Sequence, residues 1–201
     1  RLDPAFEVGV LGETGFSASL DVAVISRGEL VQTTEYRDSR PLELPGGGTS
    51  EFAREFLQVH LELEAEDVIV FSSHFKSKVN DDPARRLAEA REAREIVTEV
   101  ASANPDALVV MGGDLNDVPG SEPLDALTSN GGLRRVGSDR SVDQIWTYQF
   151  RGDEQAIDHL LIARTDGGAY VAMSATAVRD SVDGSLGYSD HAALSADFEL
   201  Y

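Results

Sequence analysis

The chain has 201 residues, of which 41% are hydrophobic and 26% charged, and its formal net charge is −19. This length suits one domain with a sizeable core and is too short for two full domains. The acidic balance argues against a protein that coats nucleic acid, which normally has a basic surface. The sequence has no cysteine, which excludes disulfides, thiolate catalysis and cysteine-ligated zinc. No run approaches the roughly eighteen apolar residues of a membrane helix, so no membrane span is expected.

Strand-like segments dominate the first third of the chain. Residues 20–26 predict a strand, and residues 55–63 alternate apolar and polar side chains, as a half-buried strand does. Between them, the glycine-rich residues 45–50 predict a mobile loop. Residues 67–73 contain a continuous apolar run, which is typical of a strand buried on both faces.

Helices and further strands follow in alternation. A long helix is predicted from the Asp82-Pro83 pair to about Ala101, because Asp is a good N-cap and Pro suits the first helical position. A shorter helix is predicted at residues 122–128. Three more strands are expected, at residues 107–111, 157–163 and 192–200. This order predicts a single layered domain of the α/β or α+β class.

Four short polar segments stand at the ends of these apolar strands, where layered α/β folds usually gather a site. They are HFKSK (residues 74–78), GGDLND (112–117), IDH (157–159) and SDH (189–191). Each has a structural explanation of its own. GGDLND could be a turn in which Asp and Asn bond their own backbone, Asp158 could cap a loop, and SDH could begin a helix. His74 could be an ordinary hydrogen-bonded histidine, and His159 should point to the opposite face of its strand from Asp158.

Taken together and in this order, HFKSK, GGDLND, IDH and SDH resemble the endonuclease/exonuclease/phosphatase superfamily. This superfamily includes pancreatic-type deoxyribonucleases, apurinic endonucleases, bacterial sphingomyelinases and inositol polyphosphate 5-phosphatases. The resemblance runs from about Leu20 to the C-terminus. It implies one domain over residues 1–201, a deoxyribonuclease-like layered β-sandwich flanked by helices that lacks its first strands. The implied activity is metal-dependent phosphodiester hydrolysis, with in-line attack of water on phosphorus.

The resemblance also implies a role for each matching catalytic residue. His191 would contact the scissile phosphate or deprotonate the attacking water, and Asp158 would hold the His191 ring in the correct tautomer. Asp114 and Asn116 would position the water and a phosphate oxygen. Because they are two residues apart on an extended segment, their side chains should share one face. His74 would donate to a phosphate oxygen or act as a general acid.

A metal site and substrate contacts are implied in the same way. Asp190 and Asp114 would hold the metal, and oxygen donors without cysteine favour Mg²⁺, with Mn²⁺ or Ca²⁺ as alternatives. Lys76, Arg85 and Asn116 would contact the substrate. Residues 74–94 include six basic and four acidic residues, which is compatible either with an anionic substrate or with a solvated helix face.

The sequence departs from the superfamily at its N-terminal side. It contains no Gln-Glu pair, whose Glu is the principal metal ligand in the superfamily. Two explanations stay open. The sequence could be the truncated part of an intact enzyme, which we favour because the other site residues are present together, or the natural protein could be a degenerate domain.

Three functions follow from these observations. The first is a bacterial, nuclease-like enzyme that acts on nucleic acid. The second is a lipid or small-molecule phosphoesterase, sphingomyelinase-like or inositol-phosphatase-like, and the third is a non-catalytic binding domain. Trp146 and Tyr148, which alternate as in a strand, are interpreted as core or substrate wall. Similarity to exported relatives predicts a secreted or periplasmic location, with the cytoplasm as the alternative, and no oligomeric state is predicted.

Overall fold

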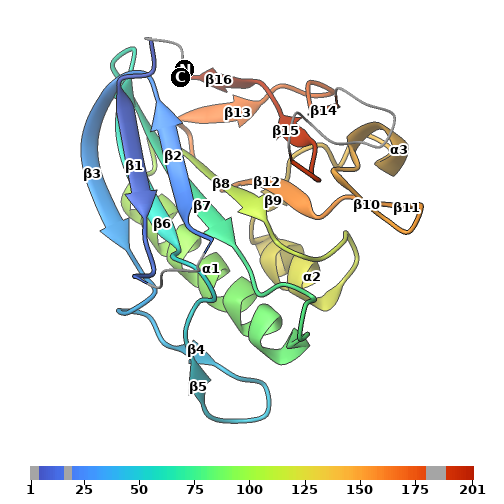
Figure 1. Ribbon diagram of the computed structural model, residues 1–201. Helices are drawn as coiled ribbons and strands as arrows, with labels where there is room; N and C mark the ends of the chain where they lie inside the picture. The colour runs from blue at the N-terminus through green and yellow to red at the C-terminus, as the bar shows by residue number, and fades with distance from the viewer. Residues whose placement is uncertain (1–4, 16–19, 180–188) are drawn as a thin grey trace.

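The computed structural model describes residues 5–15, 20–179 and 189–201 (Figure 1). Its centre is a six-stranded sheet in the order β3-β6-β7-β8-β12-β9. The strands are β3 (Glu29–Glu35), β6 (Leu57–Leu63), β7 (Glu66–His74), β8 (Leu108–Asp114), β9 (Arg134–Arg135) and β12 (Asp158–Ile162). Strands β7 and β8 are parallel, and the other four pairs are antiparallel.

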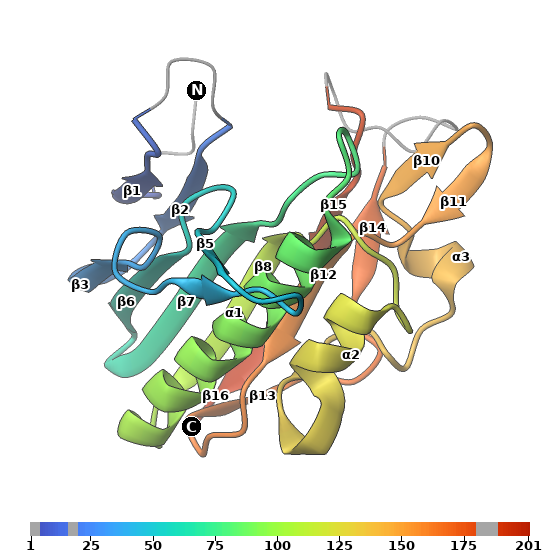
Figure 2. The same cartoon turned by 90° about the horizontal axis from the view of Figure 1, so that it is seen from below.

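The parallel pair is connected by the long helix α1 (Pro83–Ala103), as two parallel neighbours require a crossover. The helix begins as predicted, because the Asp82 carboxylate accepts the backbone N–H of Arg85 at 3.0 Å. Helix α1 and helix α2 (Glu122–Thr128) cover one face of the sheet (Figure 2). Ile96 and Val97 of α1 pack there in one core with buried side chains of the sheet, among them Ile69, Phe71, Val109, Met111 and Leu161. No helix in the described part of the chain is long and apolar enough to cross a membrane.

Three strand pairs cover the opposite face of the sheet (Figure 1). They are β1 (Val8–Gly12) with β2 (Val22–Ser26), β13 (Gly168–Tyr170) with β16 (Phe198–Leu200), and β14 (Thr176–Val178) with β15 (Ala193–Ser195). Val22 and Val24 pack against β6, and Tyr170 packs against Val110 and Ile162 of the central sheet. The layered α+β sandwich with flanking helices is therefore confirmed.

Small elements complete the chain and correct three expectations. The loop expected at residues 45–50 is partly strand, because residues 49–50 form β5 (Thr49–Ser50), which pairs with β4 (Leu42–Glu43) in a hairpin. Residues 192–200 are not one strand but two, because Asp197 between them bonds Ser174 and Val171 and redirects the chain to a second partner. Trp146 caps the end of α3 (Val142–Ile145) rather than lying in a strand. The remaining elements are η1 (Ser129–Gly131) and the pair β10 (Tyr148–Phe150) and β11 (Asp153–Gln155).

Candidate functional site

His74, Asp114 and Asp158 lie in one row across three neighbouring strands. His74 is the register partner of Asp114 in the parallel β7–β8 ladder, and Asp158 is its partner in the antiparallel β8–β12 ladder. Side chains alternate along a strand, so these three project to the same face, which is the face opposite α1. The structure thus brings together three of the predicted catalytic residues.

The glycine pair before Asp114 allows the strands to approach closely at this row. A Cβ atom on Gly113 would stand 1.8 Å from the backbone oxygen of Ser73, and Gly113 has a φ of +145°. Neither the space nor the backbone conformation admits a larger residue. The Gly-Gly-Asp sequence therefore fixes how near the end of β8 lies to the end of β7.

His191 bonds to Asp158 and joins the row from the C-terminal part of the chain. Its Nδ1 lies 2.7 Å from Asp158 Oδ2, and this hydrogen bond raises the pKa of His191 above its ordinary value. The side chain of Thr147 helps to hold the pair in place, because its Oγ1 accepts the backbone N–H of Asp158 at 3.1 Å. The ring of Tyr148 packs on the His191 ring with centroids 4.8 Å apart. With Nδ1 engaged, Nε2 is the ring nitrogen left for a ligand.

Asp114 and Asn116 come together through a turn, which corrects the expectation of an extended segment. Strand β8 ends at Asp114, and Asn116 has a φ of 54°. Asp114 Oδ1 accepts the backbone N–H of Asn116 at 2.8 Å, as in a turn closed by an Asx side chain. The amide NH₂ of Asn116 donates to Phe75 O at 3.1 Å and to Asp114 Oδ2 at 3.2 Å. Its amide oxygen, rather than its NH₂, is therefore left for a ligand.

Burial and neighbouring charges set the protonation of His74 and Asp114. Burial, followed by the nearby Arg54 charge, lowers the pKa of His74 to about 4. Burial, followed by repulsion from Asp158, raises the pKa of Asp114 to about 6. His74 Nε2 is 3.6 Å from Asp114 Oδ2, beyond an ordinary hydrogen bond. At neutral pH His74 is therefore an uncharged ring that can donate one N–H.

These side chains open on a cavity of about 670 Å³. Its described lining includes the candidate residues His74, Asp114, Asn116, Asp190 and His191. Lys78 also lines the cavity and supplies the one cation of this described lining. His159, by contrast, points to the other face as predicted, is 1% exposed, and bonds the backbone oxygen of Asp117 at 2.9 Å.

Two predicted substrate contacts lie elsewhere. The Lys76 ammonium donates to the backbone oxygens of Ser77 and Val79 at 2.8 and 2.7 Å, so it ties its own loop together. The Arg85 guanidinium donates to Glu51 O at 3.0 Å. Neither Lys76 nor Arg85 lines the described part of the cavity.

Arg54 and Lys78 are basic residues near the site that the motifs did not single out. Arg54 is close enough to lower the pKa of His74, and its buried Nε has no hydrogen-bond partner. Arg54 stands shortly before β6, and β6 runs antiparallel to β7, so the start of β6 lies at the same sheet edge as the end of β7. The predicted strand order alone could have pointed to this arginine.

The carboxylate oxygens at the site are the kind of ligand that a hard cation binds, but the described residues supply too few of them to complete a metal site. Asp158 and Asp190 both raise the pKa of Asp114, so the three carboxylates repel one another and a divalent cation would relieve the repulsion. The described residues, however, contain no group of three or more acidic or histidine side chains arranged to hold a metal ion. Asp114 and Asp190 are thus two candidate donors of an incomplete set.

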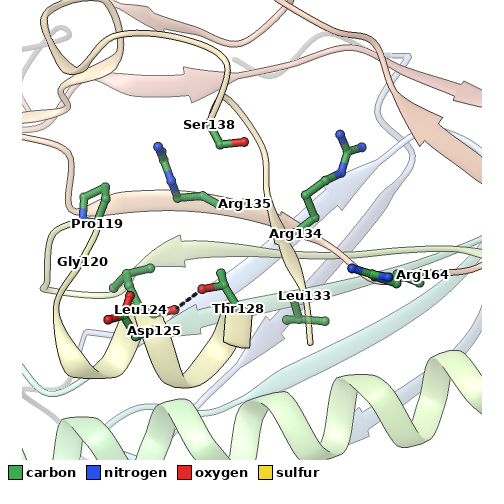
Figure 3. A pocket seen from close by; sticks show the side chains of 10 residues that line it. All are labelled: Pro119, Gly120, Leu124, Asp125, Thr128, Leu133, Arg134, Arg135, Ser138 and Arg164. Carbon is green, nitrogen blue, oxygen red and sulfur yellow. Dashed lines mark hydrogen bonds between the residues drawn. The ribbon is translucent and has the colours of Figure 1, made fainter. Parts of the chain in front are cut away.

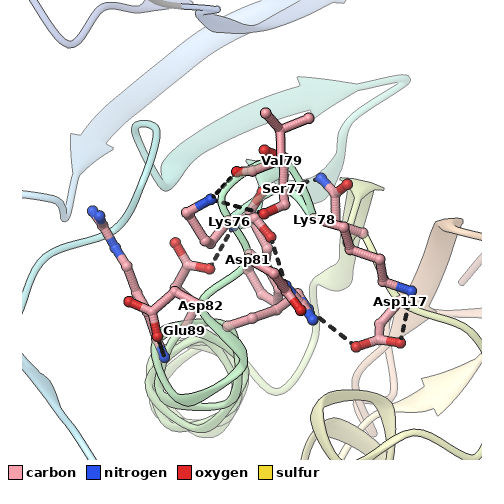
Figure 4. A network of polar contacts seen from close by, with 12 residues as sticks. Lys76, Ser77, Lys78, Val79, Asp81, Asp82, Glu89 and Asp117 are labelled. Atoms are coloured by element: carbon pink, nitrogen blue, oxygen red, sulfur yellow. Dashed lines mark hydrogen bonds and ion pairs between the residues drawn. The ribbon is translucent and has the colours of Figure 1, made fainter.

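Two buried ionisable side chains on α1, Glu89 and Arg86, tie the loops of the site together (Figure 4). Glu89 is fully buried and accepts backbone N–H groups from Ala53 and Lys76, both at 2.7 Å. Arg86 is 3% exposed and donates to Lys76 O at 3.1 Å and to Asp117 Oδ2 at 3.0 Å. The loops after His74 and Asp114 and the segment that carries Arg54 are therefore fastened to one helix.

Glu89 should make stability depend on pH. Burial raises its pKa from 4.5 to about 7. Between these values the unfolded chain loses its proton first, so the contribution of Glu89 is fully present below pH 4.5 and is lost as pH rises through about 7. We expect urea unfolding to show that the advantage of the wild type over Glu89→Gln shrinks by roughly 3 kcal/mol across this range.

The matched control is Glu95→Gln, which removes an exposed carboxylate from the same helix. Its difference from the wild type should stay constant with pH. An equally constant difference for Glu89→Gln would contradict the assignment of this titration to Glu89.

Comparisons with known proteins agree with this fold. A family model described as "Endonuclease/Exonuclease/phosphatase family" matches residues 16–166. The human Nocturnin catalytic domain with bound sulfate anion superposes with a TM-score of 0.69 at 16% identity, covering 96% of this chain and 72% of that chain. TDP2 of D. rerio, complexed with single strand DNA product, gives 0.69 at 13% identity, covering 97% and 77%. Beta toxin from Staphylococcus aureus gives 0.62 at 19% identity, covering 96% and 78%.

Among curated protein sequences, none matches the chain. At such low identities the solved structures support the fold alone, whereas the family model extends over most of the sequence, from β2 to the residues after β12. The chain belongs to the endonuclease/exonuclease/phosphatase family.

Proposed function

We propose that the protein is a metal-dependent, nuclease-like phosphodiesterase that uses an Asp–His dyad. The observation that supports this most is the bonded pair Asp158–His191 beside His74 and Asp114 on a single cavity. The family consists of hydrolases of phosphate esters, and this arrangement supplies a base, an orienting carboxylate and a neutral donor in one place.

The residues divide the reaction between them. Water attacks phosphorus in line with the leaving oxygen, and His191 Nε2 accepts the proton of that water. Asp158 holds the ring by its Nδ1–H and stabilises the imidazolium that forms. His74, neutral at pH 7, donates its ring N–H to a phosphate oxygen, while Arg54 and Lys78 offset the negative charge that develops. The leaving oxygen then takes a proton from water or from His191.

A divalent cation, Mg²⁺ in the first instance, would be held by Asp114 and Asp190 and would supply Lewis-acid stabilisation of the phosphate charge. In the superfamily the principal metal ligand is the Glu of a Gln-Glu pair, and residues 1–201 contain no such pair. We therefore propose that an N-terminally extended form binds the cation more tightly than residues 1–201 do.

Metal removal tests the proposal. We expect the N-terminally extended protein to hydrolyse bis-p-nitrophenyl phosphate with Mg²⁺ or Mn²⁺ and to lose this activity with chelator. Residues 1–201 alone should be much less active at equal metal concentration. If no metal gives activity in either protein, a non-catalytic binding domain becomes the better account.

A lipid or other apolar phosphoester is the second candidate substrate, and one observation favours it. Three apolar side chains line the cavity while remaining exposed to solvent: Leu20 is 59%, Val79 75% and Phe150 48% exposed. Such a rim could accommodate acyl chains, although exposed rings such as Phe150 also serve as stacking platforms for nucleobases. Comparing hydrolysis of sphingomyelin vesicles with that of single-stranded DNA separates the two candidates.

A further inference from the structure

Thr147 is a buried residue that stands between the two members of the Asp158–His191 dyad. It joins α3 to β10, is 0% exposed, and is absent from the described lining of the cavity. Its neighbour Tyr148 lines the cavity and packs on the ring of His191. Thr147 therefore lies behind the cavity wall, where a bound substrate does not touch it.

The side chain of Thr147 holds the backbone of the carboxylate member. Its Oγ1 accepts the backbone N–H of Asp158 at 3.1 Å and that of Ile157 at 3.3 Å. Asp158 is the first residue of β12, and its Oδ2 lies 2.7 Å from Nδ1 of His191. One hydroxyl thus fixes the stretch of backbone from which the orienting carboxylate projects.

The backbone of Thr147 holds the histidine member. Its carbonyl oxygen accepts the N–H of Ala192, the residue after His191, at 2.7 Å. Next to this bond, Tyr148 and His191 form an isolated antiparallel bridge. Asp158 and His191 are 33 residues apart in the sequence, and the segments that carry them meet at Thr147.

The hydroxyl of Thr147 differs from those of the helical residues Thr98 and Thr128. These two donate to carbonyl oxygens four residues earlier, at 2.7 and 2.9 Å, so each bonds within its own helix. The bond of Thr128 lies beside a hollow lined by α2 (Figure 3). Thr147 instead accepts N–H groups ten and eleven residues away, which is a tertiary contact. A valine of nearly the same shape would deprive two N–H groups of this acceptor.

The position of the Asp158 carboxylate decides which nitrogen of His191 carries the proton. A neutral imidazole can be protonated on either nitrogen, and the hydrogen bond that it makes selects one of them. While Nδ1–H is donated to Asp158, Nε2 is free to accept the proton of water. Displacement of the carboxylate would release the ring to the other tautomer, in which Nε2 carries the proton and cannot act as a base.

We propose that Thr147 is a positioning residue for the reaction, and that its hydroxyl holds Asp158 at bonding distance from His191. The proposal rests on the proposed phosphodiesterase function and adds a residue outside the cavity to the support of its base. The methyl group of Thr147 contributes packing and its hydroxyl contributes the hydrogen bonds, so substitution can separate the two.

The variants Thr147→Val and Thr147→Ser make this separation. Valine keeps the volume and loses the acceptor, whereas serine keeps the acceptor and loses the methyl group. At a pH where the ring is neutral, ¹⁵N shifts should show His191 in the Nδ1–H form in the wild type and in Thr147→Ser. Thr147→Val should show a mixture with the Nε2–H form.

Kinetics of the N-terminally extended protein give the second readout. With bis-p-nitrophenyl phosphate, Thr147→Val should lower kcat on the order of tenfold with little change in KM, because a misplacement of about 1 Å can cost about 10²-fold. Thr147→Ser should restore most of the rate. If valine prevents folding, Thr147→Ala against Thr147→Ser makes the same comparison without the added methyl group.

Thr128→Val is the matched control, because it removes a hydroxyl hydrogen bond on α2, which covers the opposite face of the sheet. It should change neither the tautomer nor kcat, and an effect equal to that of Thr147→Val would overturn the proposal. So would a Thr147→Val protein that melts at a lower temperature but keeps the wild-type tautomer and kcat, since the hydroxyl would then serve stability alone. Failure of Thr147→Ser to restore the Nδ1–H form would overturn it as well.

These outcomes are separate from the fate of the proposed function, because the tautomer is measured without metal, substrate or turnover. A wild type that hydrolyses no phosphodiester, but whose His191 changes tautomer in Thr147→Val and not in Thr128→Val, would reject the phosphodiesterase. It would retain the role of Thr147 in holding the dyad.

Discussion

Replacing His191 with alanine should reduce kcat for phosphodiester hydrolysis by about 10²- to 10⁴-fold, the usual contribution of a positioned general base. The ring lies at the cavity, with Nδ1 held 2.7 Å from Asp158, so its removal deletes the group that would accept the proton of water. The measurement is the rate with bis-p-nitrophenyl phosphate at saturating metal, with thermal unfolding to confirm the fold.

Asp158→Asn completes this test. An asparagine NH₂ can donate to Nδ1 and so favour the wrong tautomer of His191, and we expect a loss of about 10²-fold or more. Because the two residues act as a unit, the double variant should be little worse than His191→Ala alone.

The chain offers a matched control for the dyad. His60 and Asp67 form a second histidine–aspartate pair with the same 2.7 Å separation, outside the cavity. His60→Ala should retain nearly full activity. If His191→Ala keeps activity within a few-fold of the wild type, or if His60→Ala loses as much, the assignment of the base is wrong.

The long elements of the fold were predictable because their periodicity is strong. The strand expected at residues 67–73 is β7, and the helix expected from Pro83 ends two residues later than predicted, at Ala103. Strand β9 consists of two residues and β13 of three, lengths at which no alternation can be recognised. These short strands form because longer neighbouring strands offer unpaired backbone N–H and C=O groups. Which strands are neighbours is set by the tertiary structure and cannot be read from a short stretch of sequence.

The candidate site was predictable in its parts but not in its assembly. Polar residues at strand ends identified His74, Asp114 and Asp158, yet nothing in the sequence states that they are register partners. The side chains of Lys76 and Lys78 also differ in a way that the HFKSK motif does not reveal. Lys76 bonds backbone oxygens of its own loop, while Lys78 reaches the cavity, because the loop turns between them.

Arg86→Leu should lower the free energy of unfolding by about 3 kcal/mol, the low end of the cost of breaking a buried ion pair. Arg86 is 3% exposed, and its loss would leave Asp117, whose side chain is 14% exposed, with Lys78 at 3.4 Å as its remaining cationic partner. Urea unfolding of the purified proteins measures this change. Asp81→Asn, which removes a partner whose side chain is 47% exposed, should cost less than about 1 kcal/mol.

The same substitution should act on catalysis through the loops that Arg86 connects. Arg86 bonds the backbone after His74 and the side chain beside Asn116, so its loss should displace both residues and lower kcat more than it raises KM. The exposed Arg91→Leu on the same helix removes an equal charge and should change neither quantity. A fall in activity that only tracks the folded fraction of Arg86→Leu would show that this arginine stabilises the domain without positioning the site.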